Sequence, residues 1–275
     1  MKKLKYIICD LDGTLLNDKK TISPKQVSYI RELRKRKGVR FGFASGRTLN
    51  SLLPLAEEMG LLDVCDVLVA NNGVDIYDVK DKKNTQTLLV SVEDIQEIIR
   101  MMEPYKDFMN VIIHSKGGLY GLCETERIHR VMKMNHYSNE QYHSLYEGGY
   151  DPAARVSLLF DAERLSDVEK VVADSRFPSD IQAFQSDVDI YDLTRKGVSK
   201  ANGVELYVSR FGDTLEEVIA FGDSGNDREM MKRVGVSVAM NNAIDEILQI
   251  ADYVTEKTNN EDGVMEFLKT MEQRF

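Results

Sequence analysis

Short apolar runs alternate with amphipathic stretches in the first third of the chain. The runs cover residues 5–9, 39–44 and 67–70. Each is β-branched or aromatic and ends at turn residues, which predicts buried strands. Between the first two runs, Ser23 and Pro24 supply an N-cap and a first-turn proline for a helix that ends at Gly38. Another helix follows the second run and extends to about Met59. This strand–helix alternation predicts an α/β fold with a parallel sheet covered by helices on both faces.

The pattern changes after about residue 80. Residues 81–84 form a polar link, and strand-like and helical segments then follow one another without strict alternation. The expected strands are 111–113, 119–122, 156–160, 181–185 and 188–191. Ser91 and Asp94 resemble a capping box for a helix that extends to about Glu103, and further helices are expected at 124–134 and 162–173. Strands that neighbour one another in sequence predict a mixed or antiparallel sheet, with helices on one side. We interpret residues 82–190 as an inserted second domain.

Regular alternation resumes near residue 192. Strands are expected at 218–221, 236–239 and 253–255. Helices are expected at 200–210, from the end of the 222–227 segment to about residue 234, and at 263–271. The predicted core therefore consists of residues 1–81 and 191–275. A chain of 275 residues is long enough for two domains.

Polar side chains stand at the ends of the predicted core strands. Asp10 and Asp12 follow the first strand, and Asp223 and Asp227 follow the strand at 218–221. Ligands of parallel α/β sheets bind beyond the carboxyl ends of the strands, so these carboxylates are expected to converge. Two carboxylates about 4 Å apart repel by about 4 kcal/mol at an effective dielectric near 20. A cation between them relieves this repulsion, and Mg²⁺ suits oxygen ligands that also face a phosphate.

Other metal and phosphate motifs fit the spacing poorly. An EF-hand loop requires glycine at its sixth position, where Leu15 or Arg228 stands. No G-x-G-x-x-G follows the first strand, which leaves a dinucleotide-binding fold unsupported.

Four segments, in this order, resemble the motifs of the haloacid dehalogenase (HAD) superfamily. They are Asp10-Leu11-Asp12-Gly13-Thr14, Ala44-Ser45-Gly46-Arg47, Gly197-Val198-Ser199-Lys200 and Gly222-Asp223-Ser224-Gly225-Asn226-Asp227. The Asn72-Gly73 turn and the position of the insert are similar to those of Cof-type, sugar-phosphatase-like members with a large cap. The resemblance implies a HAD-like Rossmannoid core with an inserted α+β cap domain.

The resemblance also implies roles for individual residues. Asp10 is expected to be the nucleophile that forms an aspartyl-phosphate, and Asp12 the general acid and base. The expected phosphate-binding residues are Ser45, Gly46, Lys200 and Asn226. The expected Mg²⁺ site consists of Asp10, the backbone carbonyl of Asp12, Asp223 and Asp227, the last of these orienting the ligands.

Some residues keep two interpretations. Arg47 either reaches a substrate anion or forms a structural ion pair. Asn72 either binds substrate or occupies a left-handed turn. Asp227 also stands at a helix start, where a carboxylate is favourable without any catalytic role.

The leading hypothesis is a Mg²⁺-dependent phosphatase that hydrolyses small phosphorylated metabolites, with sugar phosphates as the first substrate class. A phosphomutase or phosphotransferase using the same aspartyl-phosphate is the alternative, and a non-enzymatic sugar-phosphate sensor is a third possibility. The complete catalytic set counts against the sensor, and the acceptor of the phosphoryl group separates the two enzymes.

Composition adds expectations about partners and location. A formal net charge of −9 argues against a nucleic-acid partner. Three widely spaced cysteines, Cys9, Cys65 and Cys123, are typical of reduced thiols. The basic first residues lead into only about four apolar ones, and no run approaches the roughly 18 apolar residues of a membrane helix. A cytoplasmic protein without a membrane partner is expected, and the sequence contains no indication of an oligomeric state.

Overall fold

The computed structural model describes residues 2–275, which divide into two compact units. The first unit consists of the chain up to Thr87 together with Val198–Phe275, and the second unit is Leu88–Gly197. The sequence-based divisions at 81/82 and 190/191 lie a few residues before these points. The difference arises from two strands: β5 (Lys83–Gln86) belongs to the sheet of the first unit, and β11 (Ile190–Arg195) to the sheet of the second.

An eight-stranded sheet forms the centre of the first unit. In spatial order its strands are β14 (Tyr253–Val254), β13 (Val236–Ala239), β12 (Val218–Gly222), β1 (Tyr6–Cys9), β2 (Arg40–Ala44), β3 (Val67–Ala70), β4 (Asp75–Asp78) and β5. The strands from β14 to β3 are parallel, whereas β4 and β5 are antiparallel additions at one edge. Cys9 pairs with Phe43 on one side and Phe221 on the other, so the ends of β1, β2 and β12 are level.

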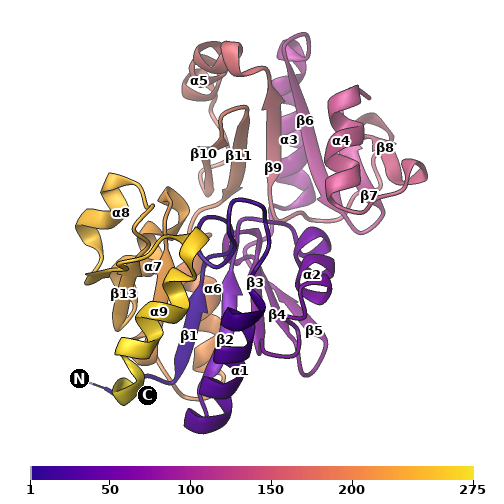
Figure 1. Ribbon diagram of the computed structural model, residues 1–275. Coiled ribbons are helices and arrows are strands. Elements are labelled where there is room, and N and C mark those ends of the chain that lie inside the picture. Colours follow the sequence, from indigo (N-terminus) through magenta and orange to yellow (C-terminus); the bar gives the residue numbers. More distant parts are fainter. Residues whose placement is uncertain (1) are drawn as a thin grey trace. The chain divides into compact units, whose positions relative to one another are not determined.

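Helices cover both faces of this sheet, which confirms the predicted α/β core. One face packs against α1 (Pro24–Lys37), α2 (Leu49–Glu58) and α9 (Gly263–Thr270). The other packs against α6 (Lys200–Ser209) and α7 (Arg228–Arg233), and α8 (Asp245–Ile250) lies against α7 (Figure 1). Short 3₁₀ segments of this unit are Asn71–Gly73, Leu215–Glu217, Gly225–Asp227, Asn259–Glu261 and Glu272–Arg274.

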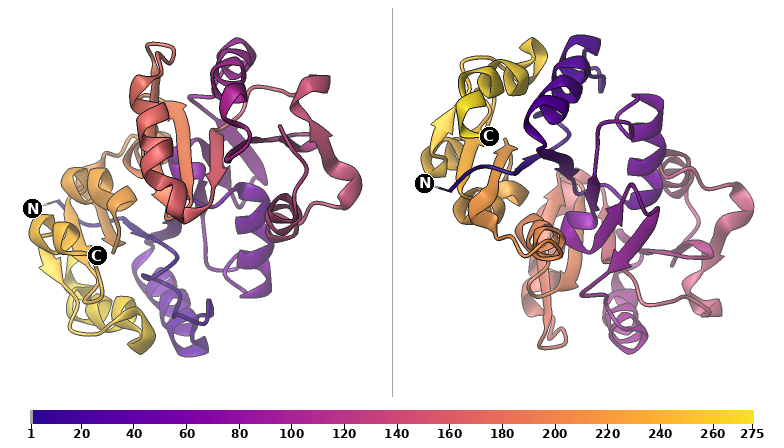
Figure 2. Two further views of the ribbon diagram at one scale, coloured as in Figure 1. Left: turned by 90° about the horizontal axis from the view of Figure 1, so that it is seen from above. Right: turned by 90° about the horizontal axis from the view of Figure 1, so that it is seen from below.

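The start and the end of α1 follow the sequence signals. The Ser23 hydroxyl accepts a hydrogen bond from the backbone N–H of Gln26 at 3.0 Å, and Gly38 ends the helix with φ at 69°. Val27, Ile30 and Leu33 are buried on one side of the helix. The N–H of Leu4 donates to the Arg274 carbonyl at 3.0 Å. Figure 2 accordingly shows the first described residues and the C-terminal end close together in both views.

The second unit has its own six-stranded sheet and its own core. The strand order is β10 (Ile181–Asp187), β11, β9 (Val156–Phe160), β6 (Met109–Ser115), β7 (Gly118–Gly121) and β8 (Tyr142–Ser144). Its helices are α3 (Val92–Met102), α4 (Glu126–Met134) and α5 (Leu165–Asp174), with 3₁₀ segments at Glu103–Tyr105, Asn139–Gln141, Leu145–Glu147 and Ala162–Arg164. Only β7 and β8 are parallel neighbours; the other pairs are antiparallel.

The helices of the second unit do not lie on one side of the sheet, and that prediction was wrong. Val111 and Ile113 of β6 pack in one cluster with residues of α3 and α5, whereas Ile112 packs in another with Ile128 and Met132 of α4. Alternate residues of a strand point to opposite faces, so helices cover both faces.

Within residues 2–275, no helix combines the length and apolarity needed to cross a membrane.

Candidate active site

A buried lysine lies between two carboxylates at the carboxyl end of β1. The Nζ atom of Lys200 is 2.5 Å from Oδ1 of Asp10 and 2.7 Å from Oδ1 of Asp227. Lys200 is completely buried, yet the charges of both carboxylates outweigh burial and raise its pKa. Its position follows from α6, which begins at Lys200 and is capped by the hydroxyl of Ser199. As the first residue of α6, Lys200 thus points its ammonium group at the carboxyl end of β1.

Three carboxylates gather at this point. One oxygen from each of Asp10, Asp223 and Asp227 lies within 4.8 Å of the others. Asp227, which is fully buried, also accepts hydrogen bonds from the backbone N–H groups of Asp223 at 3.0 Å and Ser224 at 3.1 Å. Burial raises the pKa of Asp10 well above its ordinary value, and burial also raises that of Asp223. Oxygen ligands with this excess of negative charge fit a divalent cation.

The loop after β1 is shaped to admit Asp223. Gly13 has φ at +85°, and a Cβ atom placed on it would lie 2.5 Å from Oδ2 of Asp223. The neighbouring Thr14 hydroxyl donates a hydrogen bond to Oδ1 of the same carboxylate at 2.7 Å. Glycine is therefore required here both by backbone conformation and by the close approach of the carboxylate. The contact between Thr14 and Asp223 has no signal in the sequence.

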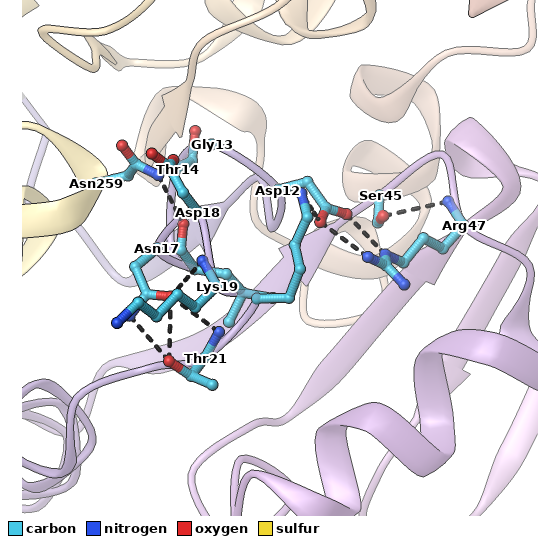
Figure 3. A network of polar contacts seen from close by, with 12 residues as sticks. Asp12, Gly13, Thr14, Asn17, Asp18, Lys19, Thr21, Ser45, Arg47 and Asn259 are labelled. Carbon is cyan, nitrogen blue, oxygen red and sulfur yellow. Dashed lines mark hydrogen bonds and ion pairs between the residues drawn. The ribbon is translucent and has the colours of Figure 1, made fainter. Parts of the chain in front are cut away.

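The carboxylate of Asp12 lies outside the three-carboxylate group. The guanidinium of Arg47 binds it with two hydrogen bonds, from Nε at 2.6 Å and Nη2 at 2.8 Å, and Nζ of Lys20 lies 2.8 Å away (Figure 3). Burial alone would raise the pKa of Asp12, but the hydrogen bonds from Arg47 and Lys20 lower it to about 2. Of the two interpretations of Arg47, the structure contains the ion pair; contact with a substrate stays a prediction.

Lys20 is a site neighbour that the sequence did not suggest. The side-chain oxygen of Asn17 accepts hydrogen bonds from the N–H groups of Lys19 at 3.0 Å and Thr21 at 3.1 Å (Figure 3). The resulting turn places Lys20 at φ +60° and directs its side chain towards Asp12. An asparagine such as Asn17 is a recognisable turn signal, but the direction of Lys20, three residues later, depends on the folded loop.

Four further expected residues lie on neighbouring loops. The hydroxyl of Ser45, a buried side chain, accepts a hydrogen bond from the N–H of Arg47 at 3.2 Å. Oδ1 of Asn72 accepts one from Nδ2 of Asn226 at 3.1 Å, and a Cβ atom on Gly46 would lie 3.2 Å from that Oδ1. Asn72 has φ at +53°, so it occupies a left-handed turn and also orients a side chain towards Asn226. Its contact with a substrate stays a prediction.

Comparisons with known proteins show the family of this chain. The family model for haloacid dehalogenase-like hydrolases matches residues 7–268. A 5-amino-6-(5-phospho-D-ribitylamino)uracil phosphatase of Bacillus subtilis is 30% identical, covering 97% of this chain and 95% of the relative. A phosphoglycolate phosphatase of Methanopyrus kandleri is 28% identical, with 96% of each chain covered.

A solved structure shares the fold of the whole chain. The crystal structure of a haloacid dehalogenase-like hydrolase from Bacteroides thetaiotaomicron has a TM-score of 0.83 and 28% identity, and the match covers 98% of this chain and all of that one. Both the expected family and the expected enzyme class agree with these relatives. The chain belongs to the haloacid dehalogenase-like hydrolases and is an enzyme of the phosphatase type found in that family.

Proposed function

We propose that this enzyme is a Mg²⁺-dependent phosphatase that hydrolyses small phosphorylated metabolites through an aspartyl-phosphate on Asp10. The observation that carries the proposal is the buried contact of Lys200 with both Asp10 and Asp227, beside Asp223. A nucleophilic carboxylate needs neighbouring positive charge to receive a phosphate dianion. Lys200 supplies one such charge, and the cluster of carboxylates suits a metal ion as the second.

The residues divide the reaction into two steps. An oxygen of Asp10 attacks phosphorus, the bond from phosphorus to the leaving oxygen breaks, and Asp12 gives that oxygen a proton. In the second step water attacks the phosphorus of the aspartyl-phosphate, Asp12 takes the proton of the water, and the Asp10 carboxylate is restored. Because Arg47 and Lys20 hold Asp12 ionised, Asp12 has to leave these partners and take up a proton from water before the first transfer. The proton that it takes in the second step restores this protonated form for the next turnover.

Asp10, Asp223 and the backbone carbonyl of Asp12 are the proposed ligands of the metal ion, and Asp227 is proposed to orient them. Bound there, Mg²⁺ supplies positive charge that stabilises the phosphoryl oxygens. Ser45, Gly46 and Asn226 are proposed to bind the same oxygens, because they lie on loops beside the end of β1. Uncatalysed monoester hydrolysis requires up to about 10²¹-fold acceleration, and one preorganised donor contributes about 3–4 kcal/mol, so several such groups have to act together.

The proposed substrate class is small phosphorylated metabolites, with sugar phosphates first. The relatives named above act on a phosphoribityl compound and on phosphoglycolate, both of them small phosphate esters. Because these two compounds differ in the group that carries the phosphate, the leaving group that this enzyme prefers has to be determined by experiment. A panel of phosphorylated sugars, cofactors and organic acids, assayed for phosphate release, ranks these classes by kcat/KM.

The nucleophile is tested by replacing Asp10 with Asn. Hydrolysis of p-nitrophenyl phosphate should require Mg²⁺ in the wild-type enzyme and fall by at least about 1000-fold in Asp10→Asn. Asp63→Asn, an identical change at an exposed position of the same unit, is the control and should retain full activity. Hydrolysis that persists in purified Asp10→Asn would refute the aspartyl-phosphate. Isomer formation in place of phosphate release would identify a phosphomutase.

A further inference from the structure

Behind the loop that carries Asn72 lies a buried carboxylate with no part in the proposed reaction. Asp75, at the start of β4, is 2% exposed. It accepts hydrogen bonds from three neutral side-chain amides: Nδ2 of Asn71 at 2.5 Å, Nδ2 of Asn84 at 2.6 Å and Nε2 of Gln86 at 2.9 Å. Burying a carboxylate is costly, and this one is compensated by donors from two segments, the Asn71–Gly73 turn and β5.

The turn held by Asp75 has an unusual backbone. Asn71, Asn72 and Gly73 have φ values of +49°, +53° and +107°, so three consecutive residues are left-handed. Asparagine adopts this conformation more readily than most residues, but two such residues in succession need support from their surroundings. The bond from the Asn71 amide to Asp75 is such a constraint, because it ties the first residue of the turn to β4.

The same turn contacts two of the loops that the proposed function needs. The N–H groups of Asn71 and Asn72 donate to the carbonyls of Arg47 at 2.8 Å and Ser45 at 3.0 Å. The side chain of Asn72 accepts its hydrogen bond from Asn226. These contacts connect the turn to the Ser45–Arg47 loop and to the loop after β12.

Gly73 packs directly against the beginning of α6. A Cβ atom on Gly73 would lie 2.1 Å from the carbonyl oxygen of Ser199, and one on Gly203 would lie 2.8 Å from Cα of Gly73. Two glycines thus let the turn touch the backbone beside Lys200. Any shift of this turn would be transmitted to the helix that presents Lys200 to Asp10.

We infer that Asp75 is a positioning residue for the phosphoryl-transfer site: through Asn71 it fixes the Asn71–Gly73 turn, which aligns Ser45, Lys200 and Asn226. This inference deepens the proposed function and rests on it for its catalytic consequence. Asn84 and Gln86 complete the support, since their amides occupy the second oxygen of the carboxylate.

Asp75→Asn and Asn71→Gly test the inference. The first variant weakens the acceptor, and the second keeps a residue that tolerates the left-handed turn while removing the amide. Each should lower kcat/KM for p-nitrophenyl phosphate about 10-fold, the size typical of residues that orient catalytic groups. The double variant should lose little more than Asp75→Asn alone, because Asn71→Gly removes one of the contacts that Asp75→Asn already weakens.

Asp78→Asn is the matched control, since Asp78 lies at the opposite end of β4. Its kcat/KM should stay within about twofold of the wild-type value. Hydrogen exchange provides a readout independent of activity: amides of residues 71–74 should exchange about 10-fold faster in Asp75→Asn than in Asp78→Asn.

The outcomes separate this inference from the proposed function. A wild-type enzyme without phosphatase activity would refute the proposed function, and the exchange measurement would still decide whether Asp75 holds the turn. Unchanged exchange at 71–74, or a lower melting temperature with unchanged kcat, would overturn the positioning role. Multiplying losses in the double variant would do so as well. If Asp75→Asn does not fold, activity and exchange in Asn71→Gly decide.

Discussion

At the scale of single residues, the carboxylate of Asp223 lies close against Gly13. Gly13→Ala should lower kcat/KM at least about 100-fold and weaken Mg²⁺ dependence of activity, because the new Cβ would displace the carboxylate. The measurement is a Mg²⁺ titration of p-nitrophenyl phosphate hydrolysis.

Gly38→Ala is the control for backbone strain. Gly38 has φ at +69°, but a Cβ atom there meets nothing within 4 Å. This variant should lose about 1 kcal/mol of stability and retain wild-type activity. An equal loss of activity in the two variants would show that strain, and not the approach of Asp223, determines the effect.

Individual site residues differ in how far the sequence reveals them. The positions of Asp10 and Asp223 could be predicted, because the sequence alone shows a carboxylate directly after an apolar strand segment. The support of Asp223 by Thr14 and of Asp12 by Lys20 could not. Thr14 and Asp223 are about 200 positions apart in the sequence, and only the folded loop brings them together. Lys20 reaches Asp12 because it lies in a left-handed turn.

At the scale of elements, two helices with equivalent caps provide a comparison. The Ser199 hydroxyl caps α6 through the N–H of Asn202 at 3.2 Å, as Ser23 caps α1 through that of Gln26. Removing either cap should cost about 1 kcal/mol of stability. Only Ser199→Ala should also lower kcat, by about 10-fold, because Lys200 is the first residue of α6.

Urea denaturation and steady-state kinetics of Ser199→Ala and Ser23→Ala make this comparison. A similar loss of kcat in both variants would mean that general stability, and not the placement of Lys200, limits activity. A full kcat in Ser199→Ala would mean that the contacts of Lys200 with Asp10 and Asp227 hold it without the cap.

The elements missed by the sequence are polar edge strands. The polar link expected at residues 81–84 overlaps β5, which covers residues 83–86, and residues 142–144 form β8. Both strands lie at the edge of a sheet, where few side chains are buried, so no apolar alternation marks them. In β5 the polar residues have a structural reason, since Asn84 and Gln86 bind Asp75. The buried strands and long helices were predictable because burial imposes their pattern.

At the scale of the whole molecule, each unit has its own hydrophobic core. The second unit is one continuous segment with a complete sheet, and its core includes Val111, Leu158 and Leu193. Residues 88–197 alone should therefore fold cooperatively, with a free energy of unfolding on the order of 5 kcal/mol. Circular dichroism in urea measures this transition.

A shorter fragment, residues 88–180, is the matched control. It lacks β10 and β11, which exposes one side of β9, and it should not unfold cooperatively. A fragment 88–197 that binds hydrophobic dyes and lacks near-ultraviolet circular dichroism would contradict the prediction.

The grouping of Lys200 with Asp10, Asp223 and Asp227 sets the net charge of the site. Three carboxylates and one ammonium sum to −2 when all are ionised. One divalent cation would make this set neutral, whereas a monovalent cation would leave it negative and a trivalent one would make it positive. An incoming phosphate dianion would then meet no net repulsion from these groups. Its recognition would depend on directed N–H and O–H donors, so selectivity between phosphate esters would be only weakly sensitive to ionic strength.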